Sequence, residues 1–146
     1  MTQNHLGGCL CGAIRYQATV DPVRGVICHC SMCRKHCGAP ILAFVHFPAD
    51  SFEWLGGQPT RFRSSEHSDR GFCPTCGSTL TMHEDVLIDR VQIVIGSLDE
   101  PGRVAVDDHV WTEDRIPWFD VADALPRFDR SSSAVATKAA QEGKGG

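Results

Sequence analysis

The chain has 146 residues, of which 42% are hydrophobic and 22% are charged, and its formal net charge is −4 at pH 7. This length predicts one domain with a sizeable core, and the composition is typical of a globular protein. The acidic balance argues against nucleic acid as a partner, because a surface that binds nucleic acid needs an excess of positive charge.

The amino terminus, MTQNHLGGCLCG, has no basic flank followed by an apolar run, so it is not expected to be a secretory signal. No apolar stretch elsewhere is long enough to span a bilayer. The sequence therefore predicts a cytoplasmic protein without a membrane partner.

Short β-strands are expected along most of the chain. Alternating or β-branched patterns mark three of them, at residues 13–20, 42–47 and 60–64. The run VLIDRVQIVIGSL, residues 86–98, is rich enough in valine and isoleucine to be a central strand or one arm of a hairpin. Helix is expected only as one or two turns after Ser31 and as a short piece over 121–125. The pattern predicts a mainly β fold with little helix.

The end of the chain differs in composition from the rest. From Ser131 onward the sequence SSSAVATKAAQEGKGG has no aromatic and almost no large aliphatic side chain. Burial there cannot compensate for the entropy lost when the backbone becomes ordered. The sequence predicts a single domain over residues 1–130 and a disordered tail over 131–146.

Eight cysteines in a chain without an export signal indicate metal binding or catalysis, because the cytosol keeps thiols reduced. Eight small buried hydrophobic side chains would be a simpler explanation. The cysteines are clustered, however, at spacings that are typical of metal ligands. They form three groups: Cys9 and Cys11; Cys28, Cys30, Cys33 and Cys37; and Cys73 and Cys76.

The first and third groups together predict a closed, structural zinc site. Residues i and i+2 of an extended strand project to the same side, so Cys9 and Cys11 would direct both sulfurs to one point. Cys73 and Cys76 have the spacing of a metal-binding turn, which Gly77 helps to close. This two-plus-two arrangement favours zinc over copper or an iron–sulfur cluster, although spacing alone leaves iron open.

The middle group predicts a second zinc with an open coordination position. Cys28 and Cys30 are again a same-side pair, and a turn at Ser31 brings Cys33 to them. Three protein ligands and one vacancy are typical of a catalytic zinc. Cys37 leaves an alternative, because it follows Cys33 by one helical turn and would close the site as a fourth ligand. The protein would then be a zinc-stabilised binding module with two closed sites and no reaction.

A zinc ion with three thiolates carries a net negative charge and activates water poorly. It suits a substrate thiol, which it would deprotonate and keep nucleophilic. Arg34, Lys35 and Arg70 are candidate ligands for the carboxylates of such a substrate. The alternative for Arg34 and Lys35 is an ordinary solvated basic pair.

Histidines near the middle group are weaker candidates. His29 is not expected to bind the metal, because it projects to the opposite side of the strand from Cys28 and Cys30. His109 and Trp111 in DDHVW are interpreted as pocket or core residues.

Six segments, in order, carry a resemblance to a known family. They are GGCLCGAIRY (7–16), ICHCSMCRKHCGAP (27–40), RGFCPTCGSTL (70–80), IGSLD (95–99), DDHVW (107–111) and PWF (117–119). Through them the chain resembles the glutathione-dependent formaldehyde-activating enzymes and the centromere protein V-like proteins that share their domain. The resemblance extends from about Gly7 to Phe128.

This resemblance implies an Mss4-like fold of coiled antiparallel β-sheets stapled by zinc. It also implies a carbon–sulfur lyase similar to S-(hydroxymethyl)glutathione synthase, which joins glutathione to formaldehyde. Cys37 departs from the family pattern, in which a non-ligand is expected at that position. Two zinc ions per chain are implied: a structural one on Cys9, Cys11, Cys73 and Cys76, and a catalytic one on Cys28, Cys30 and Cys33.

In the mechanism expected from the cluster and the resemblance, the sulfur of glutathione enters the vacant position of the three-cysteine zinc. It is deprotonated there and adds to the carbonyl carbon of a small aldehyde. Arg34, Lys35 and Arg70 would anchor the carboxylates of glutathione. The same thiol chemistry on another thiol or electrophile is an alternative, and a homodimer is compatible with the sequence.

Overall fold

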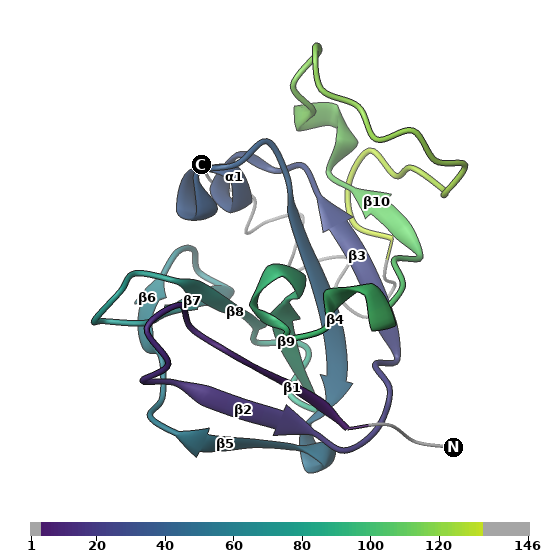
Figure 1. Cartoon of the computed structure of the whole chain (residues 1–146). Helices are drawn as coiled ribbons and strands as arrows, with labels where there is room; N and C mark the ends of the chain where they lie inside the picture. The colour runs from purple at the N-terminus through teal and green to yellow at the C-terminus, as the bar shows by residue number, and fades with distance from the viewer. Residues whose placement is uncertain (1–3, 133–146) are drawn as a thin grey trace.

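The computed structural model describes residues 4–132, which form two β-sheets and one α-helix (Figure 1). The small sheet has three strands in the order β1-β2-β5, and the large sheet has seven in the order β10-β3-β4-β9-β8-β7-β6. The strands are β1 (His5–Gly8), β2 (Arg15–Ala18), β3 (Arg24–Cys28), β4 (Leu42–Pro48), β5 (Phe52–Gly56), β6 (Thr60–Arg63), β7 (Ser68–Phe72), β8 (Thr79–Glu84), β9 (Arg90–Val94) and β10 (Asp108–Val110). The helices are α1 (Ser31–Cys37) and the short 3₁₀ turns η1 (Ala49–Ser51), η2 (Ile95–Ser97), η3 (Pro101–Arg103) and η4 (Thr112–Asp114).

The prediction of a mainly β fold with little helix is confirmed. The strands expected within 13–20, 42–47 and 60–64 are β2, β4 and β6, and the valine-rich run after residue 86 contains β9, between β4 and β8 in the large sheet. The described strands pair antiparallel, as expected, with the exception of β10, which runs parallel to β3.

The short helix expected over 121–125 is wrong, because this segment is an irregular loop. Aspartate side chains bind the backbone there instead. The Val121 amide donates to Asp120 Oδ1 at 2.9 Å, and the Leu125 amide donates to Asp123 Oδ1 at 3.0 Å. Hydrogen bonds of this kind compete with those of a helix.

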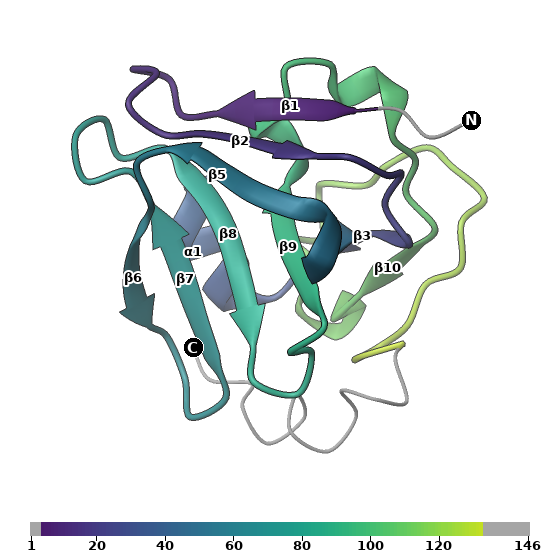
Figure 2. The ribbon, with the colours of Figure 1, turned by 90° about the horizontal axis from the view of Figure 1, so that it is seen from below.

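Each face of the large sheet buries a core of its own. Side chains alternate along β4, so Val45 and Phe47 pack in one core, and Leu42 and Phe44 pack in the other. Figure 2 shows the small sheet lying across the large one, and Tyr16 and Ala18 of β2 pack there with Val45 and Phe47. The opposite face is therefore left for α1 and the middle group of cysteines.

Helix α1 is tied to the cysteines at its start. Its amino-terminal capping residue is Cys30, whose sulfur accepts a hydrogen bond from the Cys33 amide at 3.3 Å. Gly38 ends the helix in the left-handed conformation, with φ at 72°. Since Cys33 is the buried residue of the helix, the cap and the buried contact of α1 both come from the middle group.

The tail predicted over 131–146 lies outside the described residues, apart from Ser131 and Ser132. The hydroxyl of Ser132 donates to Asp108 Oδ2 at 3.1 Å and contacts Arg24. Within residues 4–132, no helix has the length and apolar character that a membrane crossing requires. The domain boundary at residue 130 stays a prediction.

Candidate metal centres and active site

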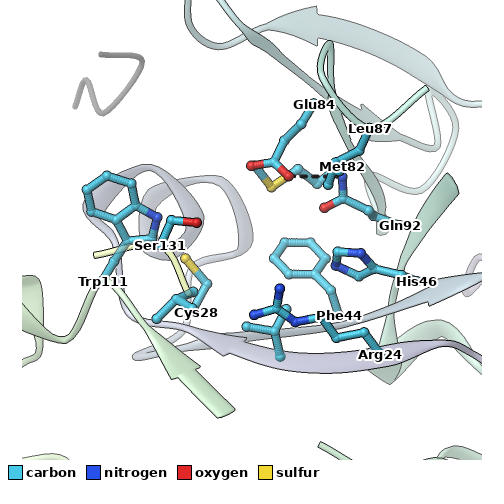
Figure 3. Close-up of a pocket in the computed structure, with 12 residues that line it drawn as sticks. Arg24, Cys28, Phe44, His46, Met82, Glu84, Leu87, Gln92, Trp111 and Ser131 are labelled. Atoms are coloured by element: carbon cyan, nitrogen blue, oxygen red, sulfur yellow. Dashed lines mark hydrogen bonds between the residues drawn. The ribbon is translucent and has the colours of Figure 1, made fainter. Parts of the chain in front are cut away.

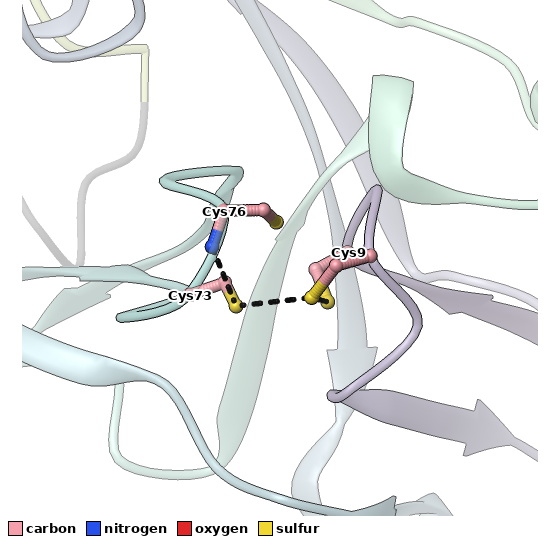
Figure 4. Close-up of side chains that lie close together, drawn as sticks. Cys9, Cys73 and Cys76 are labelled. Carbon is pink, nitrogen blue, oxygen red and sulfur yellow. Dashed lines mark hydrogen bonds between the residues drawn. The ribbon is translucent and has the colours of Figure 1, made fainter.

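Four cysteine sulfurs from two distant turns lie together (Figure 4). Those of Cys9, Cys11, Cys73 and Cys76 are all within 4.8 Å of one another. The Cys9 and Cys11 sulfurs are 3.5 Å apart, and the Cys11 and Cys73 sulfurs are 3.8 Å apart. A disulfide requires about 2 Å, whereas two sulfurs on one tetrahedral zinc lie about 3.8 Å apart. The four are free thiols, and their spacing fits a metal ion such as zinc.

A turn, and not an extended strand, brings Cys9 and Cys11 together. Strand β1 ends at Gly8 and residues 10–11 form a turn, so the expectation that this C-x-C pair lies on a strand is wrong. The turn is closed by a hydrogen bond from the Gly12 amide to the Cys9 carbonyl oxygen at 3.2 Å. The Ile14 amide also points at the Cys9 sulfur, at 3.3 Å.

Donors also surround the sulfurs of the second turn. Cys73 Sγ accepts hydrogen bonds from the amides of Thr75 and Cys76 at 3.4 and 3.5 Å. The Ser78 hydroxyl lies 3.1 Å from Cys76 Sγ, and hydrogen bonds from Ser78 lower the pKa of Cys76 to about 5. Such donors stabilise the thiolate, which is the form that binds a metal.

Three further sulfurs meet where β3 runs into α1. Cys28 ends the strand, Cys30 caps the helix and Cys33 lies in its first turn, and their sulfurs are within 4.8 Å of one another. All three side chains are buried. Hydrogen bonds from the Cys28 and Cys33 thiols hold the pKa of Cys30 far below its usual range. This group, called the cysteine trio below, is a second place where a metal ion fits.

Cys37 is not part of the cysteine trio. Its sulfur lies 3.8 Å from the Arg34 carbonyl oxygen and 3.6 Å from that of Ile41, so the thiol donates to the end of α1 and to the chain beyond it. Within the described residues, three cysteines make up the second group, against four in the first.

Arg70 lies directly beside the trio. Its Nη1 donates to Cys33 Sγ at 3.1 Å and its Nε donates to Ser64 Oγ at 3.2 Å. The side chain is 1% exposed, and its Nη2 has no hydrogen-bond partner within the described part of the chain. The guanidinium therefore offsets the negative charge of the thiolates at close range, with one nitrogen still available to a further acceptor.

The two basic residues that follow Cys33 differ in their surroundings. The Arg34 Nε donates to the His29 carbonyl oxygen at 3.4 Å, which ties the helix to the loop between Cys28 and Cys30. Lys35 is exposed. The structure thus brings Arg70 to the trio, whereas Lys35 reaches solvent.

His29 lies outside the trio and joins a chain of polar groups that runs from two buried histidines to the exposed Asp123. Its Nε2 is 2.8 Å from His109 Nδ1, and His109 Nε2 is 3.0 Å from Asp123 Oδ2. Because the carboxylate accepts from His109, that ring accepts from His29, and the Nδ1 of His29 is left as an acceptor. This chain holds the loop of Asp123 against the start of α1.

A small cavity borders the trio on its Cys28 side (Figure 3). Its volume is about 50 Å³, and polar side chains from three strands face into it: His46 of β4, Glu84 of β8 and Gln92 of β9. Phe44, Leu87 and Trp111 supply apolar walls. Trp111 adopts a left-handed conformation with φ at 56°, which is unusual for a large side chain.

The electrostatics of this cavity follow from burial. Loss of water and the charges of Arg24 and Arg90 lower the pKa of His46 to about 3, so its imidazole is neutral at pH 7. Burial raises the pKa of Glu84, while Gln92 Nε2 donates to its Oε2 at 3.3 Å. Arg24 is paired with Asp108 at 2.9 Å.

A larger groove of about 280 Å³ lies on the Arg70 side of the trio. Lys35 and His36 of α1 line it together with Phe62, Ser64 and Arg70. The cavity and the groove share one face of the large sheet, because cross-strand pairs join their residues into one row: Phe62, Arg70, Met82, Gln92, His46 and Arg24. Met82, near the middle of this row, packs against the core that contains the trio.

The sequence analysis named Cys28 and Trp111, but it missed the polar cavity residues His46, Glu84 and Gln92. The available signal was a polar residue two positions from an apolar one, because both then face the same side of the strand. His46 after Phe44 and Gln92 before Val94 are examples. This pattern indicates a polar side chain on a buried face of one strand. Only the strand register shows that such side chains from neighbouring strands lie next to one another.

Comparisons with known proteins agree with this architecture. A family model described as glutathione-dependent formaldehyde-activating enzyme matches residues 4–114. A protein of Schizosaccharomyces pombe named as an uncharacterized lyase is 37% identical over 76 residues, which are 51% of this chain and 53% of that protein, so the chain spans about half the length of this relative. A crystal structure of a Rhodobacter sphaeroides protein has the same fold, with a TM-score of 0.53 and 18% identity over 84% of this chain and 98% of that one.

Proposed function

The chain belongs to the glutathione-dependent formaldehyde-activating enzyme family, and from this premise we propose that it is a zinc-dependent carbon–sulfur lyase. It would add the thiol of glutathione to formaldehyde or a related small aldehyde. The observation that supports this most is the difference between the two cysteine groups, four sulfurs in one and three in the other, with a cavity beside the three. The name of the S. pombe relative, a lyase, agrees with this class of reaction.

Two zinc ions would be held by the sulfurs described above. Cys9, Cys11, Cys73 and Cys76 would complete a structural site, whereas the cysteine trio would leave one position to a substrate. A bound zinc would lower the pKa of a thiol at that position and so supply a nucleophilic sulfur at neutral pH. The sulfur-only donor sets fit zinc better than a hard cation such as magnesium.

The residues around the trio would bind and orient glutathione. The groove on the Arg70 side is open and lined by Lys35 at its edge, which suits the two carboxylates of glutathione. The unpartnered Nη2 of Arg70 would donate to the incoming sulfur. Arg34 does not line this groove and would add its positive charge from the side of the loop that contains His29.

In the reaction the sulfur forms a bond to the carbonyl carbon, the carbon–oxygen π bond breaks and its electron pair moves to oxygen. The oxygen takes up a proton, and the thiol has released one, so atoms and charge balance. The buried surroundings of the trio limit access of water and hold the two reactants at short range.

The test compares Cys30→Ser with Cys37→Ser, which removes the same atom from the same segment but outside the trio. Cys30→Ser should lose one zinc per chain and reduce the glutathione-dependent rate at least ~100-fold, while Cys37→Ser should keep both. Metal is counted by mass spectrometry. The rate is measured by NMR exchange between formaldehyde and its glutathione adduct, after subtraction of the uncatalysed rate. Full activity of Cys30→Ser at unchanged metal content would refute the proposal.

A further inference from the structure

One wall of the cavity beside Cys28 is formed by a buried histidine, His46. The His46 side chain is 4% exposed, and both of its ring nitrogens lack a hydrogen-bond partner within the described residues. A buried polar group without a partner costs free energy, and native proteins rarely leave two in one side chain. Its neighbour in the row, Gln92, is 3% exposed and already donates to Glu84.

The positions of these groups indicate where a ligand would lie. In Figure 3, His46, Gln92 and Glu84 are on one side of the cavity, and Cys28 and Trp111 are on the other. A molecule between them would have a polar end at His46 and its other end near the sulfur of Cys28. Because the imidazole of His46 is neutral, it offers one N–H donor without placing a full charge in the cavity.

The volume of the cavity limits what fits. An apolar cavity of about 150 Å³ accommodates benzene, and a single water needs on the order of 10–15 Å³. At about 50 Å³ the cavity has room for a molecule of a few non-hydrogen atoms and none for a tripeptide. Glutathione must therefore approach the trio from elsewhere, and the groove of about 280 Å³ that Arg70 lines is large enough to receive part of it.

We propose that this cavity is the binding site of the carbonyl substrate, with the carbonyl oxygen accepting a hydrogen bond from His46 and the carbonyl carbon facing the Cys28 side. The site then admits aldehydes of one or two carbons and rejects longer ones. This inference rests on the proposed function, because the cavity is given a substrate of the reaction proposed above. It separates the two reactants: the aldehyde occupies the enclosed side of the trio and the thiol occupies the open side.

Binding can be tested without turnover. Formamide is an unreactive planar carbonyl compound no larger than acetaldehyde, and its titration into the metal-loaded protein should shift the NMR signals of the His46 ring and of the Gln92 side-chain amide. Hexanamide, which exceeds the cavity, should leave those signals unchanged. Absence of a shift with formamide, or equal shifts with both amides, would overturn the inference.

The kinetic test uses His46→Phe, which keeps a ring of similar size and removes the donor. The KM for formaldehyde should rise about 10-fold, with the KM for glutathione unchanged. Because the variant also removes two unpartnered nitrogens, its melting temperature should rise by about 3 °C. If His46 had a purely structural role, His46→Phe would have a lower melting temperature than the wild type. His5→Phe is the matched control, since His5 is a buried histidine outside the cavity, and it should not change either KM.

A second variant tests the selectivity of the cavity among aldehydes. Leu87→Ala enlarges the cavity and should raise the preference for butanal over formaldehyde about 10-fold, whereas Leu98→Ala, a buried leucine of the other core, should not. Unchanged selectivity in Leu87→Ala contradicts the inference. If the wild-type protein accelerates no aldehyde addition at all, the proposed function fails, and formamide binding still decides whether the cavity is a carbonyl site.

Discussion

Arg70 is buried beside the cysteine trio and donates to Cys33, whereas the sequence suggested a ligand for a substrate carboxylate. The spacing of the cysteines was sufficient to group them, because i, i+2 and i, i+3 neighbours stay close in any tight turn. The position of Arg70 depends on the pairing of β7 with β8, which no local pattern reveals. The same holds for His46, which meets Gln92 only through strand register.

Replacing Arg70 with glutamine should weaken metal binding at the trio about 10-fold, because the cation that offsets the thiolate charge is lost. The four-cysteine group, which Arg70 does not contact, serves as the internal reference. Release of zinc to a chromogenic chelator measures both sites in one experiment. Arg63→Gln, in the neighbouring strand and paired with Asp85, is the control, and equal release from the two variants would contradict this role.

Asp123 gives a pH-dependent contribution to stability. The hydrogen bond from His109 and that from Arg127 lower the pKa of Asp123 to about 2, below the value of about 3.9 expected in the unfolded chain. Its contribution is therefore fully present above about pH 4 and disappears as the pH falls toward 2. Denaturant unfolding should show Asp123→Asn less stable than the wild type at pH 7, with the difference shrinking steadily as the pH falls from 4 to 2. A constant difference over this range would contradict the assignment.

At the scale of elements, the strands with clean alternation were predictable and the tightly packed ones were not. The sequence indicated a strand only around residues 28–30, whereas β3 covers Arg24–Cys28, because RGVIC has an arginine and a glycine in a five-residue strand. Gly25 is needed there, since a Cβ atom would lie 2.0 Å from the Ala105 carbonyl oxygen. Similarly, the loop at 121–125 has helix-like composition, but Asp120 and Asp123 bind its backbone amides.

Gly25→Ala should destabilise the protein by about 3 kcal/mol, because backbone atoms of the 105–107 segment cannot yield as a side chain would. The variant should also loosen β10, which pairs with β3 immediately after this segment. Chemical denaturation measures the first effect, and hydrogen exchange of the β10 amides measures the second. Gly102→Ala is the control, because its Cβ would meet nothing within 4 Å. Equal stability of the two variants would contradict the packing argument.

At the scale of the whole molecule, the four-cysteine group connects the two sheets. Cys11 and Cys73 are 62 residues apart in the chain, and their sulfurs lie 3.8 Å apart. The core around them has four buried residues, Cys9, Ile14, Cys73 and Leu80, of which two are cysteines. So small an apolar cluster stabilises little by itself, and a bound metal would supply the remaining free energy.

Removal of metal should therefore loosen one end of the molecule before the rest. In chelator-treated protein, amides of the β1–β2 and β7–β8 turns should exchange with deuterium at least ~10-fold faster, while those of β4 and β9 stay protected. Cys73→Ser should reproduce this pattern without chelator. Uniform acceleration along the chain, or no acceleration at these turns, would show that the group does not connect the sheets.

The central claim is that the cysteine trio leaves one metal position for the thiol of glutathione. X-ray absorption at the zinc edge measures it most directly, because it counts sulfur neighbours. With both sites filled, we expect a mean of about 3.5 sulfurs per zinc, rising to about 4 when glutathione is added, in wild type and in Cys37→Ser alike. A mean of about 4 without glutathione, falling in Cys37→Ser, would mean that Cys37 closes the site and would contradict the account.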